Sequence, residues 1–508
     1  MMLFHRAWQW MLRFVSPAAF AAAGVFVITV LALLVPPYIG MADNGDYFRI
    51  LNSNGLFFND PNYMNHYLGY FVKNYGIYQY YNENGATFFS TQSWFIKASM
   101  WMSQLIHPST TFDIRYQAGM YMLLYTGAVY LLVEALTWNI ARKLGYLIAA
   151  IAIFIFGDTA YTAYFNSFYG ESVVLIMMVY MVAFGLLLYR KRYNDYAMIS
   201  LFVLSAMILT ASKQQNAPVG IITALLGIFF IFIREKRGYR LVTGMLLIAL
   251  LGVGIGSYVL IPKEFELINK YHAMTRGVLL NSADPEKALE SFHIDKQYAI
   301  LTGSLYYDPY TPYKMDSPEM KEQFFDKYGF GSILVYYITH PDHAGKMLNI
   351  AAQEGFTIRP NAMGNYEASV GKAFGAHTAF FSGYSWLKEA TAPKTFGFIL
   401  IWIVVICGLY MPSFVYAIRS QEWRESLRFV LIFLFIVIGL SGIFVSIIGA
   451  GDADLGKHEF LFTLSFDVVS LITLRDLLAK QLWNNRSIGR TTPVQAGQPP
   501  HGGQAIQA

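Results

Sequence analysis

The chain alternates between long apolar stretches and polar turns. Runs of about 17 to 25 apolar residues are long enough to cross a bilayer as helices. Stretches close to that length lie near residues 15–37, 115–138, 143–160, 172–189, 195–212, 217–233, 241–261, 395–418, 427–449 and 459–478. The pattern therefore predicts an all-α polytopic membrane protein with about ten transmembrane helices.

Two polar stretches are too long to be simple turns. Residues 38–114 follow the first predicted span, and residues 262–394 follow the seventh. In the first stretch, Trp94 to Leu105 carries apolar residues at helical spacing opposite a polar face, which predicts an amphipathic helix at the membrane interface. In the second, a proline favours the start of a helix over Pro341 to Gln353.

Composition agrees with a membrane protein. The 508 residues are 55% hydrophobic and only 14% charged, whereas about a quarter of the residues are charged in typical soluble domains. The single cysteine, Cys407, excludes an intrachain disulfide, and we interpret it as a buried apolar side chain. A net charge of +5 is small for this length and gives no indication of nucleic-acid binding.

Basic residues mark one side of the membrane. They cluster in alternate turns, at Arg142 and Lys143, Arg190 to Arg192, Arg234 to Arg240, and Arg419 to Arg428. Such turns are typically cytoplasmic. We therefore expect a multi-pass protein of the cell membrane with both termini in the cytoplasm and both long polar stretches outside.

The predicted organisation follows from these spans. Residues 1–14 are a cytoplasmic N-terminus and residues 15–261 a membrane module of seven spans that includes the extracytoplasmic loop 38–114. Residues 262–394 form a large extracytoplasmic loop and residues 395–478 three C-terminal spans. Residues 479–508 are rich in Gly, Pro and Gln, and we expect a disordered cytoplasmic tail.

The string Asp43-Asn44-Gly45-Asp46 follows the first apolar run closely. Charge is costly at bilayer depth, so acids at a membrane rim belong to a site or to a wet loop. Asp43 has the alternative of capping the helix that follows, and Asp46 of pairing with Arg49 three residues on.

Three further polar strings fall at predicted outer turns, and together they predict a polar cavity at the outer membrane rim. They contribute Asp158, Asn166 and Glu171; Lys213, Gln214 and Gln215; and Asp452, Asp454, Lys457 and His458. Structural alternatives stay open for each string. Asp158 could be a wet-loop residue, Asn166 and Glu171 could hydrogen-bond to the backbone, Lys213 could neutralise an acid, and the last string could neutralise itself.

These residue types suit transfer of a sugar from a lipid phosphate. A carboxylate facing the cavity can act as general base on an acceptor hydroxyl. Basic side chains at the rim can hold the phosphate of the leaving group. The chain has neither a P-loop string nor a dinucleotide-binding glycine pattern, and a lipid-phosphate donor needs no nucleotide-binding fold.

The strings DNGDYFRI, YFNSFYGE, SKQQNAP, THPDHAGKM and GDADLGKHEFLF stand in an arrangement that resembles the GT-C superfamily of integral-membrane glycosyltransferases. More closely, they resemble the WsfD-type glycan biosynthesis hexose transferases, over residues 20 to 480. The resemblance implies a polyprenyl-phosphate sugar donor, a cell-surface glycan acceptor and an active site outside the bilayer. It implies no nucleic-acid partner.

The same resemblance assigns residues to roles. The catalytic acid of the first outer loop falls on Asp46 or Asp43, with Asp46 preferred, and the second acidic position on Asp158 or Glu171. The remaining assignments are Lys213, Arg359, Lys457 and His458 to the lipid phosphate, Asn166, Gln214 and Gln215 to sugar hydroxyls, and Asp452 and Asp454 to substrate. No cofactor is assigned, and a divalent metal stays an open alternative because Asp-x-Asp occurs only at Asp452–Asp454.

Other functions stay open as well. A transporter or flippase of lipid-linked glycans would carry polar residues near mid-span and broken helices, but the predicted spans are mostly apolar in the middle. A surface-glycan polymerase or ligase would share the outer cavity but use a diphosphate-linked donor. A non-catalytic scaffold would not need an acid facing a cavity.

Overall fold

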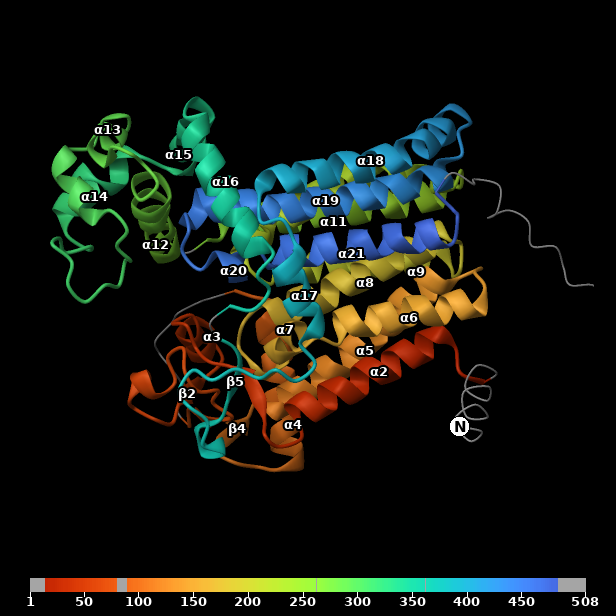
Figure 1. The fold of residues 1–508 in the computed structure, drawn as a ribbon, viewed down its shortest axis with the longest axis horizontal. Coiled ribbons are helices and arrows are strands. Elements are labelled where there is room, and N and C mark those ends of the chain that lie inside the picture. The colour runs from red at the N-terminus through yellow and green to blue at the C-terminus, as the bar shows by residue number, and fades with distance from the viewer. Residues whose placement is uncertain (1–13, 80–88, 262, 361, 483–508) are drawn as a thin grey trace, which may run out of the picture.

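The structure is a computed structural model that describes residues 14–79, 89–261, 263–360 and 362–482. A helix lies at each of the ten predicted positions. These helices are α2 (Pro17–Leu33), α5 (Arg115–Thr137), α6 (Arg142–Phe156), α8 (Glu171–Tyr189), α9 (Asp195–Thr210), α10 (Ala217–Leu226) continued by η4 (Gly227–Ile233), α11 (Arg237–Val259), α18 (Phe396–Arg419), α19 (Trp423–Ala450) and α21 (Phe460–Leu478). They run side by side as a bundle (Figure 1).

Not all ten helices are long enough, apolar enough and poor enough in charge to be membrane spans by themselves. Among the described residues, six are long and apolar enough: α5, α8, η3 to η4 (Gln214–Ile233), α11, α18 and α19. A seventh results if α6 and the segment Thr159–Asn166, bent by 52°, count as one span. α2 and α9 are apolar but have only 17 and 16 residues, and α21 carries Asp467, Arg475 and Asp476. The protein is therefore a polytopic membrane protein, and the count of ten spans stays a prediction.

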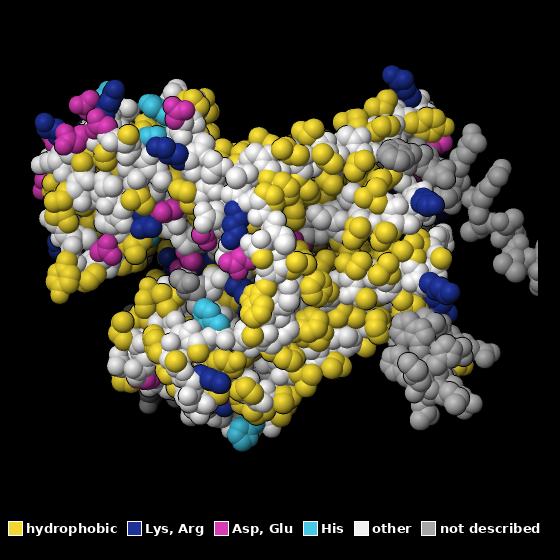
Figure 2. Space-filling model, in the orientation of Figure 1, with side chains coloured by type: hydrophobic (Ala, Val, Ile, Leu, Met, Phe, Trp, Pro, Cys, Tyr) yellow, Lys and Arg dark blue, Asp and Glu magenta, His cyan; other side chains and the backbone are white. Residues whose placement is uncertain are grey.

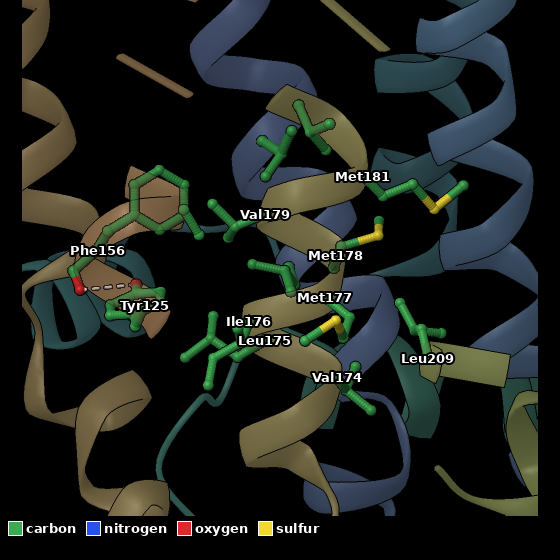
Figure 3. Packing of buried hydrophobic residues seen from close by; sticks show 14 of the residues in the cluster. Tyr125, Phe156, Val174, Leu175, Ile176, Met177, Met178, Val179, Met181 and Leu209 are labelled. Atoms are coloured by element: carbon green, nitrogen blue, oxygen red, sulfur yellow. Dashed lines mark hydrogen bonds between the residues drawn. The ribbon is translucent and has the colours of Figure 1, made fainter. Parts of the chain in front are cut away.

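α8 forms the centre of the bundle. It is apolar on every face, and 94% of its most apolar 18-residue stretch is buried inside the protein. Such burial is expected for a helix surrounded by other helices. Figure 3 shows its side chains from Val174 to Met181 packed among Tyr125, Phe156 and Leu209. α11 and α18, by contrast, are mostly exposed, and their apolar side chains face the surroundings of the protein.

The first long polar stretch folds into a small lobe. It contains β1 (Ile39–Met41), α3 (Tyr47–Ser53), β2 (Leu56–Phe58), η1 (Tyr63–Asn65), β3 (Asn74–Ile77), α4 (Gln92–Ile106) and β4 (Thr111–Asp113). Strands β2, β3 and β4 form an antiparallel sheet in that order. The predicted interfacial helix is α4, with Trp94 and Trp101 exposed and Ser99 and Ser103 buried.

The second long polar stretch is a lobe with a second hydrophobic core, which no pattern in the sequence predicted. Ile399, Ile443, Ile447 and Phe462 of the bundle complete this core. It contains α12 (Lys263–His272), the π-helix η5 (Ala273–Leu279), α13 (Pro285–Glu290), η6 (Lys296–Leu301), α14 (Pro318–Gln323), η7 (Phe325–Lys327), α15 (Phe330–Thr339), α16 (Pro341–Gly355), β5 (Met363–Tyr366), η8 (Ala368–Val370) and α17 (Gly383–Thr391). The helix predicted from Pro341 is α16. β5 pairs antiparallel with β1, which joins the two stretches.

Both lobes lie at the same end of the bundle, as the sequence predicted (Figure 1). The start of α2 and the end of α21 lie at the opposite end (Figure 1). Short connectors complete the lobe end: α7 (Thr159–Thr162), η2 (Ala163–Asn166), η3 (Gln214–Asn216) and α20 (Leu455–His458). The predicted site residues lie on or next to these connectors and on the two lobes, except Glu171, which is the first residue of α8. The side of the membrane that this end faces stays a prediction.

Candidate functional site

Asp43 organises the turn that leads into α3. Its Oδ1 accepts the backbone N–H groups of Gly45 at 2.9 Å and Tyr47 at 3.1 Å. The side chain is almost completely buried, and burial raises the pKa of its carboxyl to about 6. The helix begins at Tyr47 with Asp46 at its N-cap position, so Asp43 does not cap it as predicted but holds the preceding turn and the first backbone N–H of α3 through Oδ1.

Asp46 stands at the start of α3 and keeps 36% of its side chain exposed. It forms ion pairs with Lys457 and with Arg49, the latter at 3.6 Å. Burial of the carboxyl acts to raise its pKa, but Lys457 and Arg49 outweigh that effect and hold the pKa below its ordinary value. Asp46 is thus an accessible carboxylate whose charge is neutralised by two cations.

Lys457, on α20, connects this turn to the far end of the sequence. Its side chain is 2% exposed, and its ammonium lies 2.7 Å from Asp454 in addition to the contact with Asp46. The ring of Tyr169 lies 5.0 Å from the ammonium. Asp454 also accepts the side-chain amide of Asn44 at 2.5 Å. Two distant polar strings therefore meet in one network of charged groups.

The string from η3 lies against the same network. Lys213 pairs with Glu171 at 2.5 Å, which confirms that Lys213 neutralises an acid. Gln215 hydrogen-bonds to the Nδ1 of His458 at 2.6 Å, and Gln214 lies half-buried beside it. Burial, Lys457 and Lys213 lower the pKa of His458 well below its ordinary value, which favours the neutral imidazole.

Arg276 brings the second lobe into the site. It lies on the π-helix η5 and pairs with Asp452 at 2.7 Å. Next to this pair, Gly451 contacts the backbone of Gly277, and a Cβ at Gly451 would collide with it. Sequence analysis missed Arg276 as a site residue and weighed Arg49 only as a partner of Asp46. An arginine in a long polar stretch carries no signal of its own, and only the π-helix places Arg276 here.

Three predicted substrate residues lie elsewhere. Asp158 is fully buried, caps α7 through Ala160 at 2.8 Å, and pairs with Arg359 at 3.1 Å. The alternative that Asp158 is a wet-loop residue is therefore wrong. The amide of Asn166 donates to the carbonyls of Ile39 at 2.8 Å and Leu33 at 3.2 Å. Asp158, Arg359 and Asn166 hold the backbone together at the base of the lobes, outside the network around Lys457.

The charged network lies at a hollow in the surface. Figure 2 shows acidic and basic side chains gathered where the surface is indented between the two lobes and the end of the bundle. The cations at this site are Arg49, Lys213, Arg276 and Lys457, and each is paired with at least one carboxylate. The arrangement can therefore bind an anionic group by exchanging these internal carboxylates for it.

Within the described ranges, no group of three or more His, Cys, Asp or Glu residues is placed to hold a metal ion. We assign no residue of the site to a metal.

Comparison with known proteins gives one match. A family model described as the YfdI N-terminal transmembrane domain matches residues 5–495. No curated protein and no solved structure matches the chain.

Proposed function

The chain belongs to the family of the YfdI N-terminal transmembrane domain, and from this premise we propose that it is a membrane glycosyltransferase of the GT-C kind, similar to the WsfD-type enzymes. It moves a hexose from a polyprenyl-phosphate donor to a cell-surface glycan acceptor on the extracytoplasmic side. The observation that carries this proposal is the placement of Asp46, a partly exposed carboxylate, against Lys457 in a charged hollow at one end of a membrane bundle.

In the proposed reaction, Asp46 removes the proton of an acceptor hydroxyl. The acceptor oxygen then attacks the anomeric carbon of the hexose, and the bond from that carbon to the phosphate oxygen breaks. The electron pair of that bond leaves with the polyprenyl phosphate. Asp43 is supported as a positioning residue for this step, because it is buried and its Oδ1 holds the turn that carries Asp46.

The cations of the site supply the phosphate contacts. Lys457 is engaged by Asp46 and Asp454 when no substrate is bound. A donor phosphate competes with those carboxylates for the ammonium group, because charge-assisted contacts to phosphate are strong. Once Lys457 turns to the phosphate, the pKa of Asp46 rises and its carboxylate becomes a better base. Lys213, Arg49 and Arg276 lie close enough to the same network to share the phosphate charge.

The test compares membranes that contain the wild type, Asp46→Asn or Asp60→Asn, each incubated with a labelled polyprenyl-phosphate hexose and acceptor glycan. Asp60 is an exposed aspartate of the same lobe and serves as the matched control. We expect transfer by the wild type and Asp60→Asn, and a loss of about 10²-fold or more in Asp46→Asn. Equal transfer by all three would remove Asp46 from the reaction.

One observation favours a second candidate, a flippase of lipid-linked glycans. The helix pair α6 and Thr159–Asn166 is bent by 52° at a break, and broken helices are typical of transporters. Proteoliposomes with a labelled donor in one leaflet distinguish the two functions: movement between leaflets without sugar transfer supports the flippase. A diphosphate-linked donor that is used in place of the monophosphate supports a polymerase or ligase.

A further inference from the structure

Three buried arginines lie at the end of the bundle opposite the two lobes. Arg190 follows the last residue of α8, Arg428 is on α19, and Arg475 is on α21. Their charged neighbourhood includes one buried carboxylate, Asp476. Figure 2 shows Lys and Arg side chains on the surface of this end as well.

Two of these arginines form hydrogen bonds and an ion pair with described parts of the protein, although the Nε of Arg428 makes no hydrogen bond among the described residues. Arg475 donates to the carbonyl of Leu136 at 2.6 Å and to Asp476 at 2.6 Å. Arg428 donates to the carbonyl of Gln481 at 2.7 Å and pairs with Asp476 at 3.2 Å. Both side chains therefore hold backbone carbonyls near the ends of helices and share one carboxylate.

The carboxylate of Asp476 is already occupied by other groups and has little capacity to pair with a third arginine. Besides the two guanidinium groups, it accepts the hydroxyl of Tyr410 at 2.9 Å. The next carboxylate, Glu425, is in contact with the hydroxyl of Tyr189 at 3.4 Å. Even with Glu425 counted, Arg190, Arg428 and Arg475 face two carboxylates, because Asp195 at the same end is paired with Arg424 and Arg234.

Among the described residues, Arg190 is the one of these three arginines that forms no ion pair, although the charge of Asp476 acts on it from a distance. It is 9% exposed, and within the part of the chain that the structure describes, its buried Nε has no hydrogen-bond partner. The end of α8 supplies a partial negative charge of about half a unit, which is less than a guanidinium needs. A buried charge that is not paired is costly, so the site favours an added anion.

We propose that Arg190 anchors a phosphate-binding site at the end of the bundle opposite the lobes. A guanidinium binds phosphate oxygens through two parallel N–H donors, which suits this anion better than a point charge would. The site lies where the apolar helices end, the level at which lipid phosphates are found. The phosphate group of an anionic phospholipid is therefore the ligand we assign, and dissolved phosphate is the second source of the same chemistry.

The experiment uses the full chain, purified and stripped of lipid. Native mass spectrometry and thermal unfolding are measured with phosphatidylglycerol, with phosphatidylcholine and with inorganic phosphate. We expect the wild type to retain phosphatidylglycerol and gain thermal stability from it, and Arg190→Gln to bind it about tenfold more weakly. Arg237→Gln, at an exposed arginine that begins α11 at the same end of the bundle, is the matched control and keeps wild-type binding.

Further outcomes decide between the sources. Equal stabilisation by inorganic phosphate, with no addition from phosphatidylglycerol, supports the phosphate site and overturns the lipid as its ligand. If the Arg190→Gln variant binds phosphatidylglycerol and inorganic phosphate as tightly as the wild type does, the site itself is overturned. If Arg190→Gln does not fold, Arg190→Lys is tested instead, because it keeps the charge and removes the two parallel N–H donors of the guanidinium. Undiminished binding by that variant contradicts the bidentate site.

Discussion

Lys457 forms an ion pair with Asp46, a residue 411 positions earlier in the chain. Its ammonium also contacts Asp454, so one buried cation holds two carboxylates from different ends of the sequence. This contact and the hydrogen bond from Asn44 to Asp454 join the first lobe to the turn before α21. The ion pair with Lys457 also means that the carboxylate we propose as a base is held in its weakly basic form until Lys457 finds another anion.

Replacement of Lys457 by methionine tests both roles of this cation. Loss of the phosphate contact is expected to lower kcat/KM by about 10²-fold. Without Lys457 the pKa of Asp46 rises, because the cation that lowers it most is lost. Since the base must be deprotonated, activity falls at acidic pH from a higher pH than in the wild type. The measurement is kcat/KM as a function of pH.

Lys372→Met, at an exposed lysine of the second lobe, controls for the loss of a charge. Lys457→Arg keeps a cation at the site and is expected to recover part of the activity. A Lys457→Met enzyme with wild-type kcat/KM and an unshifted acidic limb would contradict the proposed exchange.

Asp43 gives a dependence of stability on pH. In the folded protein the pKa of Asp43 is raised to about 6, above its ordinary value of 3.8, so the fold favours the protonated form. Its contribution to stability is therefore largest below pH 4 and is lost as the pH rises towards 6. At about 1.4 kcal/mol for each unit of pKa difference, the ionised form costs on the order of 3 kcal/mol.

Asp43→Asn keeps the oxygen that accepts from Gly45 and Tyr47 and removes this charge. We expect its thermal unfolding midpoint to exceed that of the wild type at pH 8, and the difference to vanish near pH 4. Asp316→Asn, at an exposed aspartate, should show no such trend. A variant that is less stable than the wild type at pH 8 would show that the carboxylate of Asp43 has a partner in the fold.

Much of the architecture could be predicted from apolar length alone. Each long apolar run became a helix, and the helices at Trp94 and Pro341 followed from spacing and from proline. The convergence of the polar strings also followed, because alternate turns of a bundle lie at the same end. The second hydrophobic core and the β1–β5 pairing could not be predicted, since strands of three or four residues have too little alternation to be recognised.

The pairing of distant charges was beyond the sequence, whereas the pair of Asp46 with Arg49 three residues on was a stated alternative and is present. Nothing local decides that Lys457 meets Asp46 while Lys213 meets Glu171, because these partners are 411 and 42 residues apart and meet only through the packing of the helices. Burial decided the rest. Asp158 stands between an apolar helix and a turn, a position compatible with a wet loop, and only the packing of α17 and Arg359 over it encloses the side chain.

Gly451 controls the approach of the second lobe to the site. Its φ of +61° is unfavourable for other residues, and a Cβ would lie 2.7 Å from the carbonyl carbon of Arg276. Gly451→Ala is therefore expected to push η5 away, weaken the Arg276–Asp452 pair and cost about 1–3 kcal/mol of stability. Transfer activity and thermal unfolding are the measurements. Gly449→Ala, where nothing lies within 4 Å, is the control and should behave like the wild type.

The buried pair of Asp158 and Arg359 separates a structural role from a substrate role. Removal of one partner leaves an unpaired buried charge, so Asp158→Ala is expected to lower stability by about 3–5 kcal/mol. The double variant Asp158→Asn, Arg359→Gln carries no charge and should recover part of that loss. Folded protein of the double variant should transfer sugar at close to the wild-type rate, because neither residue belongs to the network around Lys457. A double variant with wild-type stability but little transfer would instead assign the pair to substrate, as the resemblance implied. Thermal unfolding and transfer per folded molecule, measured on the same preparations, decide between the two roles.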